Sequence, residues 1–162
     1  ALKRLKQSKE FSSLGEKIEG IYFSYAMTIL ENNKSTPWRL GFYHKSTDKM
    51  MTFIVDEGEI KMENEEEIFK KPGMEVKKVD IEKIKIPYDE ILKKAEELRK
   101  NRHSNELARK TIAILQNLGE FGNIWNITYV THSFNTLNIK INTENGKILH
   151  HSLESLMDFV KK

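Results

Sequence analysis

Two stretches of similar design decide the fold: WRLGFYHKSTDKMMTFIVDEGEI at residues 38–60 and WNITYVTHSFNTLNIKINTENGKI at residues 125–148. In each, a tryptophan opens a run in which apolar and polar residues alternate, as in a half-buried strand. Gly58 follows Trp38 by twenty residues, and Gly146 follows Trp125 by twenty-one, each in the turn before the last strand. The pattern therefore predicts two antiparallel meanders, with strands near 38–43, 51–55 and 59–62, and near 125–129, 137–141 and 147–150.

Outside these stretches, apolar residues at three- and four-residue steps precede each tryptophan. They predict a helix over residues 9–32, stopped before Pro37, and a helical region over 88–118, opened by Pro87. The second region is either one continuous helix or two, with Ser104 capping the later one. We further expect an acidic connector at 63–73, an edge strand within 76–86 and a short closing helix over 152–160.

The two halves share order, spacing and periodicity, which indicates an internal duplication. The predicted fold class is α+β, with two pseudo-repeats, each a helix packed on an antiparallel β-meander, and a short C-terminal helix. The predicted units are residues 1–73 and residues 74–162, packed together as one pseudo-symmetric body. Its helices should cover one face of each sheet and leave the other face, or an edge strand, free for a partner.

The second half, residues 91–149, resembles PepSY-like domains, which have a helix, a strand meander and a final turn of the form Asp-x-x-Thr-Gly-Lys. The matching segment runs from Asn142 to Lys147, with asparagines at 142 and 145 where the family usually has Asp and Thr. The turn of the first half, residues 55–60, is one residue shorter. The resemblance implies a small binding or inhibitory module, in a family that often acts outside the cytoplasm and has no family-wide catalytic residue.

Composition excludes several functions. Without cysteine the chain forms no disulfide, thiolate metal site or cysteine nucleophile. The net charge of +3, from 27 basic and 24 acidic residues, gives no strong field for nucleic acid. The basic segment 93–110 is interleaved with glutamates at helical spacing, which favours a salt-bridged surface over a phosphate-binding one.

The origin and location of the chain are predicted only from general trends. Heavy use of Lys, Glu and Ile is typical of AT-rich genomes and of thermophilic archaea, while the many asparagines count against extreme heat. With no apolar run near the length of a membrane span, we expect a cytoplasmic protein. The alternative is a removed leader, since the chain starts at Ala1.

No motif for catalysis or for a cofactor is found: a glycine-rich phosphate loop, Gly-x-Ser-x-Gly and His-Glu-x-x-His are all missing. We therefore expect no enzyme, no cofactor and no metal site. The aromatic residues near each tryptophan are most simply core residues, but an exposed subset would mark a partner site. The candidate partner-binding residues, including two histidines at similar distances after the tryptophans, are Trp38, Tyr43, His44, Trp125, Tyr129 and His132.

Three functional hypotheses follow. The first is a non-enzymatic binding or regulatory module that engages a protein through a sheet face or edge, the partner being another protein or a second copy of the chain in a homo-oligomer. The second is a small-molecule binder or enzyme with a pocket between the halves, where His44 and His132 converge; a separation beyond about 15 Å would count against that convergence. The third is weak nucleic-acid binding through segment 93–110.

Overall fold

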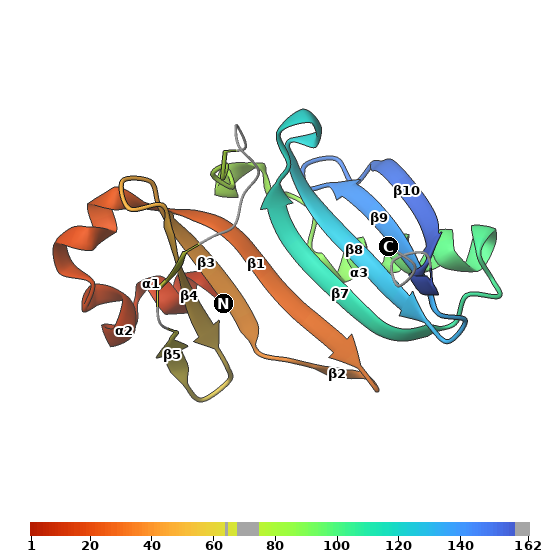
Figure 1. The fold of residues 1–162 in the computed structure, drawn as a ribbon, viewed down its shortest axis with the longest axis horizontal. Coiled ribbons are helices and arrows are strands. Elements are labelled where there is room, and N and C mark those ends of the chain that lie inside the picture. The colour runs from red at the N-terminus through yellow and green to blue at the C-terminus, as the bar shows by residue number, and fades with distance from the viewer. Residues whose placement is uncertain (64, 68–74, 158–162) are drawn as a thin grey trace.

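The computed structural model describes residues 1–63, 65–67 and 75–157 of the chain (Figure 1). The helices are α1 (Leu2–Lys6), α2 (Lys9–Ser12) and α3 (Tyr88–Arg102), with 3-10 turns at Gly15–Gly20, Ile81–Lys83 and Gly119–Phe121. The strands are β1 (Ile21–Glu31), β2 (Lys34–Ser35), β3 (Trp38–His44), β4 (Lys49–Val55), β5 (Ile60–Met62), β6 (Glu66–Glu67), β7 (Ala108–Asn117), β8 (Asn123–Thr131), β9 (Asn135–Asn142) and β10 (Ile148–Ser155).

One ten-stranded antiparallel sheet contains all of the described strands. Its order is β5-β4-β3-β1-β7-β8-β9-β10, with β2 paired to β1 and β6 paired to β4. The two meanders are thus joined edge to edge along β1 and β7, whose register places Thr28 opposite Ala113. The α+β class is confirmed, and the six strands predicted after the two tryptophans are all present.

The prediction of a helix over residues 9–32 is wrong. Only Lys9–Ser12 is α-helical, and the longest part of the segment is β1. Gly15, at φ +56°, adopts a left-handed conformation shortly after this helix, where the chain enters the 3-10 turn Gly15–Gly20. The run from Ile21 to Ile29 is rich in aromatic and β-branched residues, which fit a pleated surface better than a helix.

The helical region predicted over 88–118 is half right. Helix α3 ends at Arg102, and the later part forms β7. Within β7, Ala113 and Leu115 are buried while Ile112 and Ile114 are half-exposed, which is the alternation of a strand. Strand β1 is therefore a fourth strand of the first meander and β7 a fourth strand of the second. The sequence pattern had predicted both as helix.

Two smaller predictions also fail. The segment 76–86 contains a 3-10 turn and no strand. The closing helix predicted over 152–160 is strand β10 up to Ser155, residues 156–157 are helical, and residues 158–160 lie outside the described part. The predicted boundary between residues 73 and 74, like most of the acidic connector, falls outside it too.

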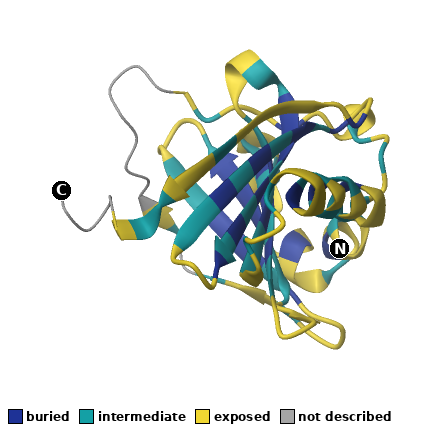
Figure 2. Cartoon of the chain, turned by 90° about the vertical axis from the view of Figure 1, so that its right-hand side faces the viewer, coloured by how far each residue is buried: buried dark blue, intermediate teal, exposed yellow. Residues whose placement is uncertain are grey.

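The three α-helices lie on the same face of the sheet (Figures 1 and 2). Their buried residues Leu5, Phe11, Ile91 and Ala95 pack with the strand residues of that face in one core. The core residues contributed by the strands include Phe23, Ala26, Leu40, Phe42, Phe53, Ala113, Leu115, Trp125, Ile127, Tyr129, Ile139 and Ile141. We call this side the helix side and the opposite side the open face.

Candidate small-molecule pocket between the two meanders

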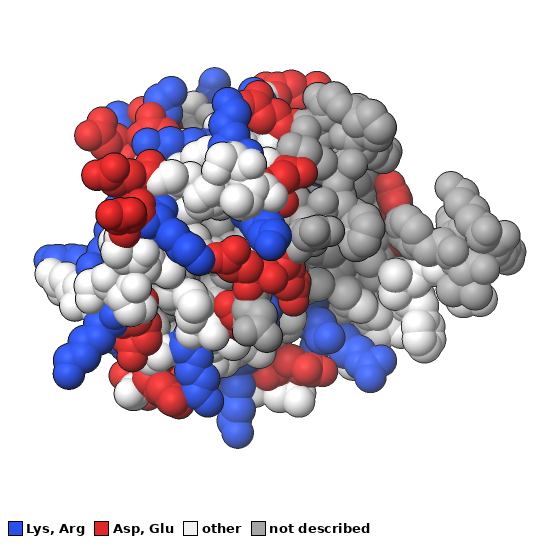
Figure 3. Space-filling model, turned by 60° about the vertical axis from the view of Figure 1, so that its left-hand side comes forward, with Lys and Arg blue, Asp and Glu red and all other residues white. Residues whose placement is uncertain are grey.

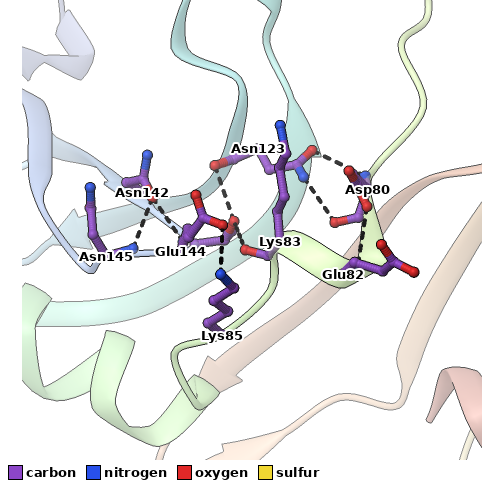
Figure 4. Close-up of polar contacts among 9 residues, drawn as sticks. Asp80, Glu82, Lys83, Lys85, Asn123, Asn142, Glu144 and Asn145 are labelled. Carbon is purple, nitrogen blue, oxygen red and sulfur yellow. Dashed lines mark hydrogen bonds and ion pairs between the residues drawn. The ribbon is translucent and has the colours of Figure 1, made fainter.

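A connecting segment of residues 78–86, here called the strap, runs past the seam between the two meanders (Figure 4). The side-chain amide of Asn123 donates to the backbone oxygen of Asp80 at 2.9 Å, and its oxygen accepts from the backbone N–H of Asp80 at 3.3 Å. The hydroxyl of Thr143 donates to the backbone oxygen of Lys83 at 2.9 Å. Because Asn123 and Thr143 are buried, these bonds fix the strap to the second meander.

At the seam, Trp38 of β3 and Trp125 of β8 meet on the helix side. Their ring centroids lie 6.1 Å apart, although β1 and β7 separate their strands. Three strand spacings put the two backbones roughly 14 Å apart in a flat sheet. Of the buried seam residues between them, Ala26, Thr28 and Ala113 are small and Leu115 is large, and the three small ones leave room for the two indoles to lean together.

Tyr88, the first residue of α3, completes this aromatic cluster. Its ring centroid lies 5.2 Å from that of Trp38 and 5.0 Å from that of Trp125. Trp125 is buried, whereas Trp38 is half-exposed and lines the pocket described next. The strap leads directly into α3 and so sets where Tyr88 stands.

Beside this cluster lies an apolar pocket of about 480 Å³ that is open to solvent, which we call the central pocket. This is a volume that suits a small organic ligand. Its lining comes from both meanders, the strap and the start of the chain: Ala1, Leu2, Phe23, Ala26, Trp38, Leu40, Ile81, Ile84, Tyr88, Leu115 and Trp125.

Two polar atoms of the lining residues have no hydrogen-bond partner among the described residues. These are the phenol oxygen of Tyr88 and the indole nitrogen of Trp125, both of them buried atoms. Burial, assisted by the charge of Asp89, raises the pKa of Tyr88 to about 12. At neutral pH Tyr88 is therefore an uncharged phenol that can both donate and accept, while Trp125 can only donate.

The structure places the other predicted site residues elsewhere. Tyr43 and Tyr129 are buried, with the Tyr43 phenol donating to Asp48. The phenol of Tyr129 lies by Glu96, and burial raises its pKa. These tyrosines are therefore packing residues and not an exposed aromatic face.

His44 and His132 do not converge. His44 pairs with Ile21 at the start of β1, whereas His132 is exposed and follows Thr131, level with the far end of β1. About ten residues along the strands separate the two levels, which amounts to roughly 30 Å. The convergence that would have supported a shared histidine pocket is therefore absent for these two residues.

Sequence reasoning found Trp38 and Trp125 but missed Tyr88 and the strap. Tyr88 gives no local signal beyond its place after Pro87, and the strap was interpreted as an edge strand. The described residues hold no group of three or more His, Asp or Glu side chains that could bind a metal.

Neither positive nor negative charge dominates the surface drawn in Figure 3. On the face that carries the start of the chain, basic and acidic side chains are intermixed (Figure 3). Within the basic segment 93–110, Arg99 is buried, and its guanidinium is hydrogen-bonded to the carboxylate of Glu96. Arg99, one of the cations that nucleic-acid binding would need at the surface, is thus buried and bonded to Glu96.

The fold and this site define an α+β protein with one broad antiparallel sheet and an aromatic pocket at its seam. No protein-family model matches the chain, and no curated protein matches it in sequence. Among solved structures it is similar to a "putative lipoprotein" from Clostridium difficile, with a TM-score of 0.53 at 14% identity. That similarity covers 88% of this chain and 89% of the other, and it shows a shared fold.

No helix in the described part of the chain is long and apolar enough to cross a membrane.

Proposed function

We propose that this protein binds a small, mainly apolar molecule in the central pocket. The observation that carries the proposal is the apolar lining of this pocket, which residues of both meanders, the strap and the aromatic cluster form together. Apolar surface is unfavourable in water, so a ligand that covers this lining would gain free energy by removing it from water.

The chemistry of the lining restricts the ligand. Trp38, Tyr88 and Trp125 favour flat or extended apolar groups, because their rings offer large contact areas. The lining contains no charged side chain, which favours an uncharged group at this position.

Tryptophan fluorescence offers a direct test, because the only two tryptophans of the chain both lie at the site. We expect the uncharged probe 2-naphthol, an apolar double ring with one hydroxyl, to change the emission saturably. Ala26→Leu should weaken this response by adding bulk to a lining residue. The matched control, Ala108→Leu, makes the same change at an exposed position of β7 away from the pocket.

Unfolding has to be separated from blocking. Overpacking at a buried position costs about 1–3 kcal/mol, so near-ultraviolet circular dichroism must first show that Ala26→Leu keeps its tertiary structure. If the probe gives no saturable change with the wild-type protein, or if both variants respond like the wild type, the central pocket is not a ligand site.

A second candidate function is protein binding through the open face. Ile114 pairs with Met27 and Ile112 with Ile29, so these four half-exposed apolar residues share that face at the seam. Such a patch on a sheet favours a protein partner. Ile114→Lys should abolish retention of a partner that the wild type and Thr136→Lys, a change on the same face farther from the seam, both retain.

The remaining expectations stay predictions. Membership of the PepSY-like family, a cytoplasmic location and a thermophilic origin each need evidence beyond a shared fold. Nucleic-acid binding through segment 93–110 has no specific observation in its favour.

A further inference from the structure

A second apolar cavity adjoins the central pocket on the helix side. It has a volume of about 390 Å³, and we call it the side pocket. Its lining residues are Lys6, Phe11, Ile18, Ile21, Tyr22, Phe23, Phe42, Lys78 and Ile81. Phe23 and Ile81 line both cavities, so the two are neighbours, and together we call them the groove.

The two rims and the floor of this groove each run from the central pocket to the side pocket. On one rim, α1 contributes Leu2 to the central pocket and Lys6 to the side pocket. The opposite rim is the strap, which contributes Ile84 to the central pocket and Lys78 to the side pocket.

The floor is β1, which passes from Ala26 in the central pocket to Ile21 in the side pocket. These five residues of strand cover roughly 15 Å, which is long for a compact ligand and suits an extended chain. The groove therefore has a defined long axis, with different chemistry at its two ends.

The two ends differ in charge. Lys6 and Lys78 are exposed at the side-pocket end, and neither forms an ion pair with any residue in the described part of the chain. No Asp or Glu lines either cavity. Lysine stems can lie along apolar surface while their ammonium groups stay in water, so this end suits an anion at the mouth of an apolar channel. The far end is lined by apolar side chains and by the rings of Trp38, Tyr88 and Trp125.

We propose that the groove binds a free acyl-chain carboxylate whose carboxylate lies between Lys6 and Lys78. The chain extends along β1 between α1 and the strap, and its apolar end lies beside the rings of Trp38 and Tyr88. This inference rests on the proposed function of the central pocket and specifies its ligand class. The ligand is a monomer taken from solution, since a membrane lipid would present its headgroup at a surface.

The test compares three ligands of equal chain length below their micelle concentrations, with tryptophan fluorescence as the readout. We expect dodecanoate to bind more tightly than 1-dodecanol, which lacks the carboxylate, and more tightly than 12-hydroxydodecanoate, whose hydroxyl would enter the apolar end. If the alcohol binds as well as dodecanoate, the anionic end is refuted while an apolar pocket remains. If none of the three binds although 2-naphthol does, the groove is refuted and the central pocket stands.

Variants locate the carboxylate. Lys6→Gln combined with Lys78→Gln should weaken dodecanoate binding by about fivefold, because each exposed charge contributes modestly. It should leave 1-dodecanol binding unchanged. The matched control, Lys3→Gln with Lys77→Gln, changes the net charge equally at neighbouring residues that line neither cavity. Equal weakening by both pairs would overturn the assignment, as would binding only to phosphatidylglycerol vesicles and not to the monomeric ligand.

Discussion

Removing the hydroxyl of Tyr88 should stabilise the ligand-free protein, although most substitutions of buried residues destabilise. The phenol oxygen is buried without a partner among the described residues, while the ring contacts Trp38 and Trp125 at 5.2 and 5.0 Å. Phenylalanine keeps these ring contacts and removes only the oxygen. Because an unpaired buried polar group costs about 1–3 kcal/mol, we expect Tyr88→Phe to raise the free energy of unfolding by about 1 kcal/mol.

Urea denaturation and thermal unfolding measure this change, and a gain of 1 kcal/mol corresponds to a rise of about 2–4 °C in Tm for a chain of this size. Tyr129→Phe is the matched control, since Tyr129 is buried on the same side of the sheet but its phenol is next to Glu96. That control should lose about 1 kcal/mol, the usual contribution of a hydrogen bond. If Tyr88→Phe loses as much as Tyr129→Phe, the Tyr88 oxygen has a partner and the reasoning fails.

Three further predictions follow from the same structure. Since burial raises the pKa of Tyr88 to about 12, above its value of 10.0 in the unfolded chain, the protonated phenol favours the folded state up to pH 10. That stability should be lost as the pH rises from 10 to 12, and Tyr88→Phe should lose less over this range in urea melts. Asn123→Ala removes two hydrogen bonds to Asp80 and should lower the free energy of unfolding by about 2 kcal/mol, with faster hydrogen exchange in the strap; unchanged exchange would contradict its anchoring role. Gly41→Ala should cost at least about 2 kcal/mol in the same melts, because the new methyl group would lie 1.9 Å from the ring of Tyr25; a near-neutral change would show that this ring moves aside easily.

The sequence pattern predicted the strands of both meanders but assigned β1 and β7 to helices. In β1, Ile21, Tyr25 and Ile29 recur at four-residue steps, and four is a multiple of the strand period as well as close to the helical one. Only the side chains between them distinguish the two structures. Once paired in the sheet, β1 and β7 also join the meanders, a long-range contact that no local periodicity reports.

The turn that carried the family resemblance illustrates what short motifs do predict. The side-chain oxygen of Asn142 accepts from the backbone N–H groups of Glu144 and Asn145, at 2.8 and 3.1 Å (Figure 4). An aspartate would accept the same bonds, so the asparagine preserves the turn. Gly146 follows at φ +74°, a conformation that glycine adopts readily. Such a motif predicts a turn reliably and a function poorly.

The seam between β1 and β7 explains why the two tryptophans meet while the two histidines separate. Because β1 and β7 are antiparallel, β3 and β8 also run in opposite directions. Trp38 and Trp125 begin their runs at nearly the same level, beside Thr28 and Ala26 of β1. From there the two strands diverge, so residues placed at matching distances after the tryptophans move apart toward opposite ends of the sheet.

A site shared by two meanders joined in this way can therefore form only from residues near the seam. Residues at matching positions in β3 and β8 lie close together where each strand begins, at the tryptophans. Residues later in the two strands lie farther apart, because the strands run in opposite directions. The central pocket occupies this position, with one tryptophan from each meander, small seam residues beneath and Tyr88 delivered by the strap that links the halves. For this reason we place the ligand site at the tryptophans and not at the matching histidines.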